Sequence, residues 1–386
     1  MIALNEVCQG FSHIESRKPC QDNSFSEVNP NGIGIAIISD GHGGKRYFRS
    51  EVGSKLITGI TRDKMMSFIS NFGTSHLKKT PFTKRKSIKS QIEDNDFEKQ
   101  DKIDIAFRQL FGSIIYEWNQ KVEQHAKENP LTEKEREGLE ENWIRDFENK
   151  EKLEKVYGCT LIAAAFTPSY WFAFQIGDGK CFTVNEEGQW SEPIPWDDQC
   201  FLNKTTSICD TDALDEFRYC YEGDGRIPVS IILASDGLDD SFGSEENQEN
   251  FYVQILKSII KKGKFDTEKD IKEALPELSK KGSKDDMSIA MLYNEKKLRN
   301  MYKIFLQWQI DNLSRHIDEQ NWKINEANRI QENLGSIDSP TKQNLIDLQY
   351  ANKDYNRAID ERSRLQIRLD IIKKEFLEEK WNCQKS

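Results

Sequence analysis

Apolar runs that end or begin beside an aspartate are the feature that most restricts how this sequence can fold. The run "GIGIAIIS" is followed by Asp40 and "GHGG", and comparable runs stand before "GDGK", before "SDGLDD" and after "KDDM". Their length and β-branched residues predict buried strands. Strand ends are therefore expected beside five aspartates: Asp40, Asp178, Asp236, Asp240 and Asp285. Taken alone, strand–Asp–Gly is also the pattern of an ordinary tight turn.

The distribution of these runs predicts the fold class. The first 60 residues alternate short apolar runs with turn residues and then enter a helical pattern over residues 45–61. Residues 63–155 are polar and charged, with helix-like segments, and strand-like runs return after them. One such segment, residues 102–128, carries apolar residues at helical spacing: Ile105, Leu110, Ile114 and Trp118. Strands with helices between them predict an α+β, sheet-based domain over residues 1–296, in which residues 63–155 hold a helical insertion.

The composition changes after that domain. A heptad pattern runs from about residue 298 to 334, "GSIDSP" then provides helix-breaking Gly and Pro, and a second helical pattern follows, including Leu345, Leu365 and Leu369. Residues 297–386 are therefore expected to form an antiparallel helical hairpin or coiled coil. Such a hairpin either packs along the sheet domain as plain structure or projects as an arm for self-association or for a partner protein.

Charge and cysteine usage narrow the class of protein. The 386 residues carry a formal charge of −10, which argues against a general nucleic-acid binder. The basic stretch 77–91 is expected to be a solvated loop, because acidic residues follow it at once. The eight cysteines show no C-x-x-C spacing, and no apolar run approaches the roughly 20 residues of a membrane span. We expect no signal peptide and no membrane association, and a location in the reducing cytoplasm.

Carboxylates gathered at neighbouring strand ends have a chemical consequence. They repel one another unless cations neutralise them. Oxygen ligands without nearby His or Cys favour Mg²⁺ or Mn²⁺ over Zn²⁺. Two such ions about 3.5–4 Å apart can activate a bridging water for attack on phosphorus.

Six motifs in a fixed order also carry a family resemblance. They are "RKPCQD", "SDGHGG", "GCT", "IGDGK", "ASDGLDD" and "DDMS", between about residues 8 and 294. With them the chain resembles the type-2C (PPM-type) metal-dependent Ser/Thr protein phosphatases, and their bacterial branch more than the animal one. The resemblance implies an antiparallel β-sandwich flanked by helices, an α-β-β-α arrangement, with metals at one edge. It implies two Mg²⁺ or Mn²⁺ ions, with a third, looser position.

The resemblance also implies roles for individual residues. Asp40 matches the aspartate that bridges both metals, and Gly41 matches the glycine whose carbonyl binds one of them. Asp236 and Asp285 match carboxylates that complete the other site, and Asp178 and Asp240 match the third position. Asp22 matches a carboxylate that holds a metal-bound water, His42 matches the proposed general acid, and Arg17 matches the phosphate-binding arginine.

The chain departs from the family pattern in places. Gln21 stands where glutamate is commoner, so one carboxylate of the usual site is missing. Lys18 is adjacent to Arg17, and a one-residue shift would exchange their roles. Residues 196–207, "WDDQCFLNKTTS", are expected to lie in or beside the variable flap over the site. His13, like the remaining histidines outside the motifs, is expected to be an ordinary core or surface residue.

These expectations combine into one leading function and one alternative. The leading function is a protein serine/threonine phosphatase that hydrolyses phosphomonoesters of a phosphorylated protein, with a metal-activated water and no covalent intermediate. The alternative is a catalytically weak phosphatase-like scaffold or sensor that acts through its C-terminal hairpin. The retained aspartates favour the enzyme.

Overall fold

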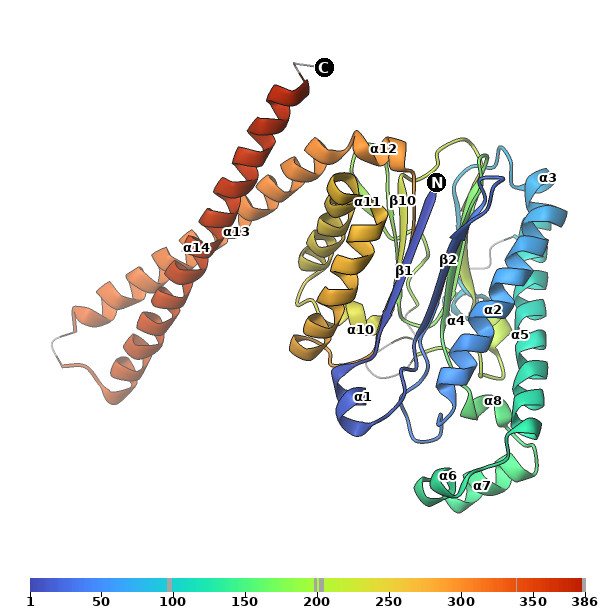
Figure 1. The fold of residues 1–386 in the computed structure, drawn as a ribbon. Helices are drawn as coiled ribbons and strands as arrows, with labels where there is room; N and C mark the ends of the chain where they lie inside the picture. Colours follow the sequence, from blue (N-terminus) through green and yellow to red (C-terminus); the bar gives the residue numbers. More distant parts are fainter. Residues whose placement is uncertain (96–98, 198–199, 201–204, 338, 384–386) are drawn as a thin grey trace. The chain divides into compact units, whose positions relative to one another are not determined.

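The computed structural model describes residues 1–95, 99–197, 200, 205–337 and 339–383 (Figure 1). Residues 198–199 and 201–204 of the expected flap, 196–207, lie outside the described residues. The chain divides into two compact units. One comprises Met1–Gln248 and Gln254–Arg299, and the other comprises Glu249–Val253 and Asn300–Ser386.

Two antiparallel sheets form the first unit. The five-stranded sheet has the order β1 (Ile2–Cys8), β11 (Met287–Tyr293), β10 (Ser230–Ala234), β7 (Lys180–Val184) and β8 (Trp190–Ser191). The six-stranded sheet has the order β2 (Asn23–Val28), β3 (Gly34–Ser39), β5 (Leu161–Phe166), β6 (Trp171–Ile176), β9 (Arg218–Glu222) and β4 (Thr83–Arg85). Every pair of neighbouring strands is antiparallel.

Strand β3 shows how the sequence builds the layers. All six of its residues are buried, because each face of the strand meets a different core. Ala36 and Ile38 face the interior between the sheets, where Ile231 and Leu233 of the other sheet also lie. Ile35 and Ile37 belong to the second core, beneath the helices. A continuous apolar run is the expected pattern for a strand that is covered on both sides.

Helices α2 (Ser50–Phe68) and α5 (Lys102–Glu128) cover the outer face of the six-stranded sheet (Figure 1). Trp118 of α5 is fully buried, and its Nε1 donates to the Gly53 carbonyl of α2 at 3.1 Å. Leu110 and Ile114 are buried as their spacing predicts, but Ile105 is 50 % exposed. All four residues lie in the helix that their spacing predicts, and Ile105 lies in its first turn, off the stripe that meets the sheet.

The insertion contains further short helices before and after α5. They are the π-helix η1 (Ile69–Gly73), α3 (Thr74–His76), α4 (Ile88–Glu93), α6 (Glu133–Gly138), α7 (Glu141–Glu148) and α8 (Leu153–Val156). The basic stretch is not simply a solvated loop, because β4 within it pairs with β9 and α4 follows. Arg85 of β4 donates to buried Asp104 at 2.9 Å, which neutralises part of its charge.

Arg49 joins the insertion to the start of α2. Its buried guanidinium binds the Glu135 carboxylate with Nε–Oε1 2.8 Å, donates to the Asn129 carbonyl at 2.7 Å, and lies over the Phe147 ring. Burial favours a higher pKa for Glu135, but hydrogen bonds from Arg49 and Thr132 outweigh it and lower this pKa to about 2.

The remaining helices of the first unit are α1 (Phe11–Ser16), α9 (Ala213–Glu216), α10 (Asp236–Asp239), α11 (Glu245–Lys281) and α12 (Glu295–Arg299). Helix α11 is broken at Gly263, whose φ of 81° is left-handed, and it lies on the side of the sandwich formed by β1 and β10 (Figure 1). The helix–sheet–sheet–helix arrangement confirms the predicted fold class.

The second unit is a helical hairpin of α13 (Tyr302–Gly335) and α14 (Lys342–Cys383). Side-chain hydrogen bonds from Gln331 to Asn352 (2.9 Å) and from Arg362 to Asn321 (3.4 Å) fix an antiparallel register. Leu365 is buried as predicted, but Leu345 is 49 % exposed. Alanines take the interior positions of α14 before residue 360, namely Ala351 and Ala358. No helix in the described ranges is both long and apolar enough to cross a membrane.

Candidate metal centre

Asp40 directly follows β3, and the "GCT" motif holds its backbone in place. The Asp40 N–H donates to the Thr160 hydroxyl at 3.1 Å, and the Thr160 N–H donates to the Asp40 carbonyl at 2.8 Å. Gly41 forms an isolated bridge with Cys159. A Cβ at Gly41 would lie 2.7 Å from the Gln21 carbonyl oxygen, so only glycine allows this approach.

Three carboxylates converge at this edge of the sandwich. One oxygen from each of Asp40, Asp178 and Asp236 lies within 4.8 Å of the others, and all three residues are partly buried. Asp178 follows Gly177, whose φ of 110° turns the chain from β6 to β7. Asp236 opens α10, directly after β10. The predicted convergence of strand ends is therefore present for these three residues.

The electrostatics of the group favour a bound cation. Burial, with Asp178 and Asp22 nearby, raises the pKa of Asp236 to about 8. Burial and the charges of Asp236 and Asp22 also raise the pKa of Asp40 well above its usual range. An isolated cluster of this kind must take up either protons or cations at neutral pH.

Asp22 lies beside this group. It is buried, and neither of its carboxylate oxygens has a well-formed hydrogen bond with a described residue. Burial raises its pKa to about 7. Interactions with Asp40 and with the Ser288 and Ser235 hydroxyls lower this pKa, but they do not outweigh burial. A buried carboxylate so weakly paired, next to three others, fits a site that holds hard cations and their waters.

Asp240 and Asp285 lie at the margin rather than within the 4.8 Å group. Both are exposed. The charge of Asp285 raises the pKa of Asp236, and that of Asp240 raises the pKa of Asp178, in each case after larger contributions that include burial. They are therefore near enough to interact with the cluster, but the structure does not bring their oxygens into the same close set.

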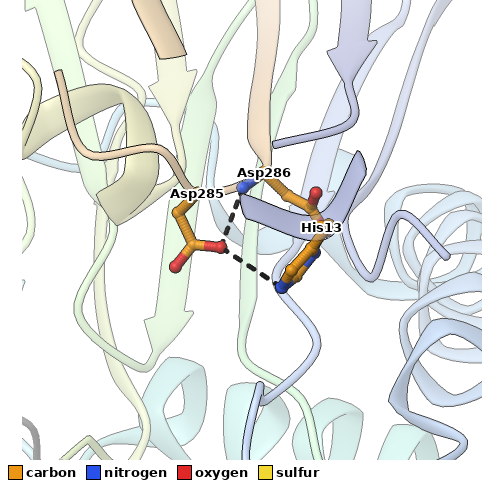
Figure 2. Close-up of side chains that lie close together, drawn as sticks. All are labelled: His13, Asp285 and Asp286. Carbon is orange, nitrogen blue, oxygen red and sulfur yellow. Dashed lines mark hydrogen bonds and ion pairs between the residues drawn. The ribbon is translucent and has the colours of Figure 1, made fainter. Parts of the chain in front are cut away.

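A histidine that the sequence does not single out contacts Asp285. Figure 2 shows His13 beside Asp285 and Asp286, with Nε2–Oδ1 3.8 Å to Asp285. The His13 Nδ1 lies 2.9 Å from Asp286 Oδ2, and the backbone N–H groups of Gly10 and Gln21 donate to the same carboxylate at 2.6 and 2.5 Å. Asp286 thus ties helix α1 to the start of β11. No local spacing could reveal this contact, since its partners lie near opposite ends of the first unit in the sequence.

Gln21 is the residue that replaces the usual glutamate. Its side-chain Nε2 donates to the His42 carbonyl at 3.1 Å and to the Ser50 hydroxyl. Its Oε1 is buried and has no hydrogen bond with a described residue. The amide therefore secures the loop after Asp40 and leaves one neutral oxygen near the site.

His42 lies in the same loop. Its backbone N–H donates to the Gly158 carbonyl at 3.1 Å. Its ring packs edge-on against Tyr47, and the ring Nε2 lies 2.7 Å from the Ser207 Oγ. Burial lowers the pKa of His42 to about 4, so the imidazole is neutral at pH 7 until a negative group binds beside it.

Arg17 and Lys18 follow α1 and are both exposed. The Arg17 backbone adopts the left-handed conformation, with φ 56°. Its guanidinium makes no hydrogen bond or ion pair with a described residue. Lys18 instead donates from Nζ to the Gly43 carbonyl at 3.2 Å. Of the two cations, Arg17 is the one left for a ligand.

Comparison with known proteins gives the family. The family model described as protein phosphatase 2C matches residues 9–276. No curated protein matches the chain. Among solved structures, a bacterial serine phosphatase is 18 % identical, with 75 % of this chain and 96 % of that chain covered and a TM-score of 0.42.

Two further solved structures are similar. The serine/threonine phosphatase Stp1 of Staphylococcus aureus is 16 % identical, over 76 % of this chain and 96 % of that chain, with a TM-score of 0.43. The catalytic domain of the phosphatase PstP, in complex with two manganese ions, is 15 % identical, over 75 % and 96 %, with a TM-score of 0.40. Because the family model covers more than half of its length, the chain belongs to the protein phosphatase 2C family.

Proposed function

We propose that this chain is a metal-dependent protein serine/threonine phosphatase with a centre of two Mg²⁺ or Mn²⁺ ions. The observation that carries the proposal is the convergence of Asp40, Asp178 and Asp236 within 4.8 Å, together with their raised pKa values. Oxygen-only ligands of this charge suit hard divalent cations. When bound, the ions supply an activated water for attack on phosphorus.

The proposed ligands rest on the family resemblance together with the places of these residues at strand ends. Asp40 and the Gly41 carbonyl would hold the ions from the six-stranded sheet, and Asp236 and Asp285 would hold them from the five-stranded sheet. Asp178 and Asp240 would provide a third position. Asp22, with buried oxygens free of well-formed hydrogen bonds, would orient a water of the bound ions.

The substrate side of the site rests on two residues. Arg17 seats the phosphate, since a guanidinium matches two phosphate oxygens and this one has no other described partner. His42 protonates the departing serine or threonine oxygen. A phosphate dianion beside the ring favours its charged form and opposes the effect of burial.

Substrate class and location belong to the same proposal. Family membership supports phosphoserine or phosphothreonine in a protein as the substrate. The seven described cysteines are free thiols, which is consistent with a reducing cytoplasm. The hairpin of α13 and α14 is proposed to recruit a protein partner or a second copy.

Hydrolysis of a phosphothreonine peptide tests this function. The full chain is assayed with EDTA, Mg²⁺ or Mn²⁺, beside Asp40→Asn and Asp236→Asn. We expect metal-dependent turnover that each substitution lowers by more than about 100-fold, because changes even to residues behind the ligands cost 10–100-fold. Asp94→Asn, which alters an exposed ion pair with Lys86, is the matched control.

Two outcomes would contradict the proposal. Turnover that survives both substitutions would mean that these carboxylates are not the centre. A folded protein without turnover under any metal would favour the scaffold function through the hairpin.

A further inference from the structure

Ser207 is a buried residue whose hydroxyl lies against the candidate general acid. It is 3 % exposed, and its Oγ lies 2.7 Å from the His42 Nε2. The two residues are 165 positions apart in the sequence. The distance is that of a strong hydrogen bond, and its direction depends on where the Ser207 proton goes.

The surroundings of Ser207 offer its proton another acceptor, which favours one direction. Its Oγ donates to the Cys159 carbonyl at 3.0 Å, and the Cys209 N–H donates to the same Oγ at 3.3 Å. The Cys209 sulfur, 3.2 Å away, is a weaker acceptor than a carbonyl. A hydroxyl has one proton, so with that proton on the Cys159 carbonyl, Ser207 can only accept from His42.

The turn that carries Ser207 is itself held in place. The Ser207 N–H donates to the Asp210 Oδ2 at 2.9 Å, and the Asp210 N–H donates to the Ser207 carbonyl at 3.0 Å. The other Asp210 oxygen forms an ion pair with Lys155, Nζ–Oδ1 2.7 Å. The Ser207 backbone is thus held in place, so its buried hydroxyl stays beside the His42 ring.

We propose that Ser207 is a positioning residue, whose hydroxyl holds the His42 ring with its Nε2 protonated and leaves Nδ1 as the nitrogen that exchanges a proton with the substrate. The inference rests on the proposed function. In that reaction a water oxygen bonds to phosphorus and releases a proton to solvent, while the P–O bond to the leaving group breaks. The imidazolium form of His42 gives its Nδ1 proton to the departing oxygen. The ring that remains is neutral and carries its proton on Nε2, facing Ser207.

The dependence on the leaving group separates positioning from general structural damage. A phosphothreonine peptide leaves as an alkoxide and needs a proton, whereas p-nitrophenyl phosphate has a good leaving group and needs little help. In the full chain with metal, we expect Ser207→Ala to lower kcat on the peptide by about 10–100-fold, which is at or below the roughly 100–10,000-fold that a general acid contributes, because the variant keeps His42 itself. On p-nitrophenyl phosphate we expect a loss of less than about 3-fold. Ser207→Thr keeps the hydroxyl and is expected to restore most of the peptide kcat.

Two further variants sharpen the test. His42→Ala should show the same selectivity, and adding Ser207→Ala to it should cause no further loss, because one residue acts through the other. Ser230→Ala removes a fully buried hydroxyl in β10 and should leave both substrates unaffected. Equal losses of kcat on both substrates with Ser207→Ala, or no loss on either, would overturn the proposal.

A measurement without turnover distinguishes this inference from the proposed function. Nitrogen-15 NMR of the histidine rings reports which nitrogen carries the proton. We expect the Nε2-protonated tautomer for His42 in the parent protein and a mixture of tautomers in Ser207→Ala. If the tautomer is unchanged in the variant, the role of Ser207 fails even where the enzyme is active. If the tautomer shifts but no variant or parent hydrolyses either substrate, Ser207 still positions the ring and the phosphatase proposal fails alone.

Discussion

Gly237 lies where the chain after β10 passes close to the residues that precede β11. A Cβ built there would lie 2.0 Å from the Asp286 carbonyl oxygen and 3.3 Å from the Asp285 Cβ. Real side chains do not approach backbone atoms this closely, so the glycine allows Asp236 and Asp285 to stand side by side. The requirement is spatial, since this glycine is not left-handed.

Gly237→Ala is therefore expected to destabilise the fold by about 1–3 kcal/mol, the range seen when a methyl group is forced into packed surroundings. It should also weaken metal binding, because α10 must move away from β11. Urea unfolding and metal titration by calorimetry measure the two effects. Gly243→Ala is the matched control, since nothing lies within 4 Å of its Cβ position. Equal stability of the two variants would contradict the packing argument.

The aspartates of the site could be predicted from the sequence, but their partners could not. Asp40, Asp178 and Asp236 each adjoin an apolar run, so strand geometry alone places them at one edge. The contact of His13 with Asp286 and that of Ser207 with His42 depend on how distant segments pack. No periodicity or spacing encodes such contacts, and they become visible only in three dimensions.

At the scale of elements, the pair of Arg49 and Glu135 joins α6 to the first turn of α2. The Arg49 side chain is nearly fully buried and that of Glu135 is 23 % exposed. Since the folded-state pKa of Glu135 is about 2 and the ordinary value is 4.5, this pair stabilises the fold fully above pH 4.5. The contribution is lost as the pH falls from 4.5 towards 2.

We expect Glu135→Gln to lower the free energy of unfolding at pH 7 by about 1–2 kcal/mol, after allowing for solvent screening of a partly exposed group. The difference between parent and variant should shrink as the pH is lowered from 5 to 2.5. Urea denaturation across this range measures it, with Glu148→Gln, from the exposed pair with Arg136, as control. A difference that stays constant with pH would show that the charge of Glu135 is not its contribution.

Helical periodicity predicted the existence of α5, α13 and α14 better than it predicted which residues they bury. Leu110, Ile114 and Trp118 are buried as expected, whereas Ile105 and Leu345 are exposed. Ala351 and Ala358 lie in the hairpin interior instead. Periodicity identifies a helix by its apolar stripe, but small residues can line a close helix–helix contact that a search for large apolar residues does not find.

At the scale of the whole molecule, every proposed site residue lies in the first unit, and the hairpin forms the second. The order of six motifs was sufficient to predict the sandwich, because that order is typical of one family and the family implies the fold. The composition change near residue 297 indicated the hairpin. The role expected for it from the sequence, self-association or partner binding, stays a prediction. Several large apolar side chains of the hairpin are exposed: Trp322, Tyr350, Ile367 and Ile371.

Shortening the hairpin tests its separation from catalysis. Residues 322–361 are replaced by a short glycine-rich linker, which keeps the register set by Asn321 and Arg362. We expect kcat/KM on p-nitrophenyl phosphate to change by less than about 2-fold, because no proposed ligand is removed. Light scattering then reports whether self-association requires the distal hairpin. A large loss of activity on the small substrate would contradict the separation of the two units.

The position of the acidic cluster has a mechanical consequence for the sandwich. Asp40 follows β3 of one sheet and Asp236 follows β10 of the other. The layer between the sheets consists mostly of aliphatic and small side chains, with Phe166 and Trp171 among them, and their attraction has no preferred direction. As proposed, a divalent ion held by both residues would cross-link the sheets at that edge. Without it, the same carboxylates would repel one another across the gap. We therefore expect local opening to begin at the acidic edge and the far ends of the sheets to separate last.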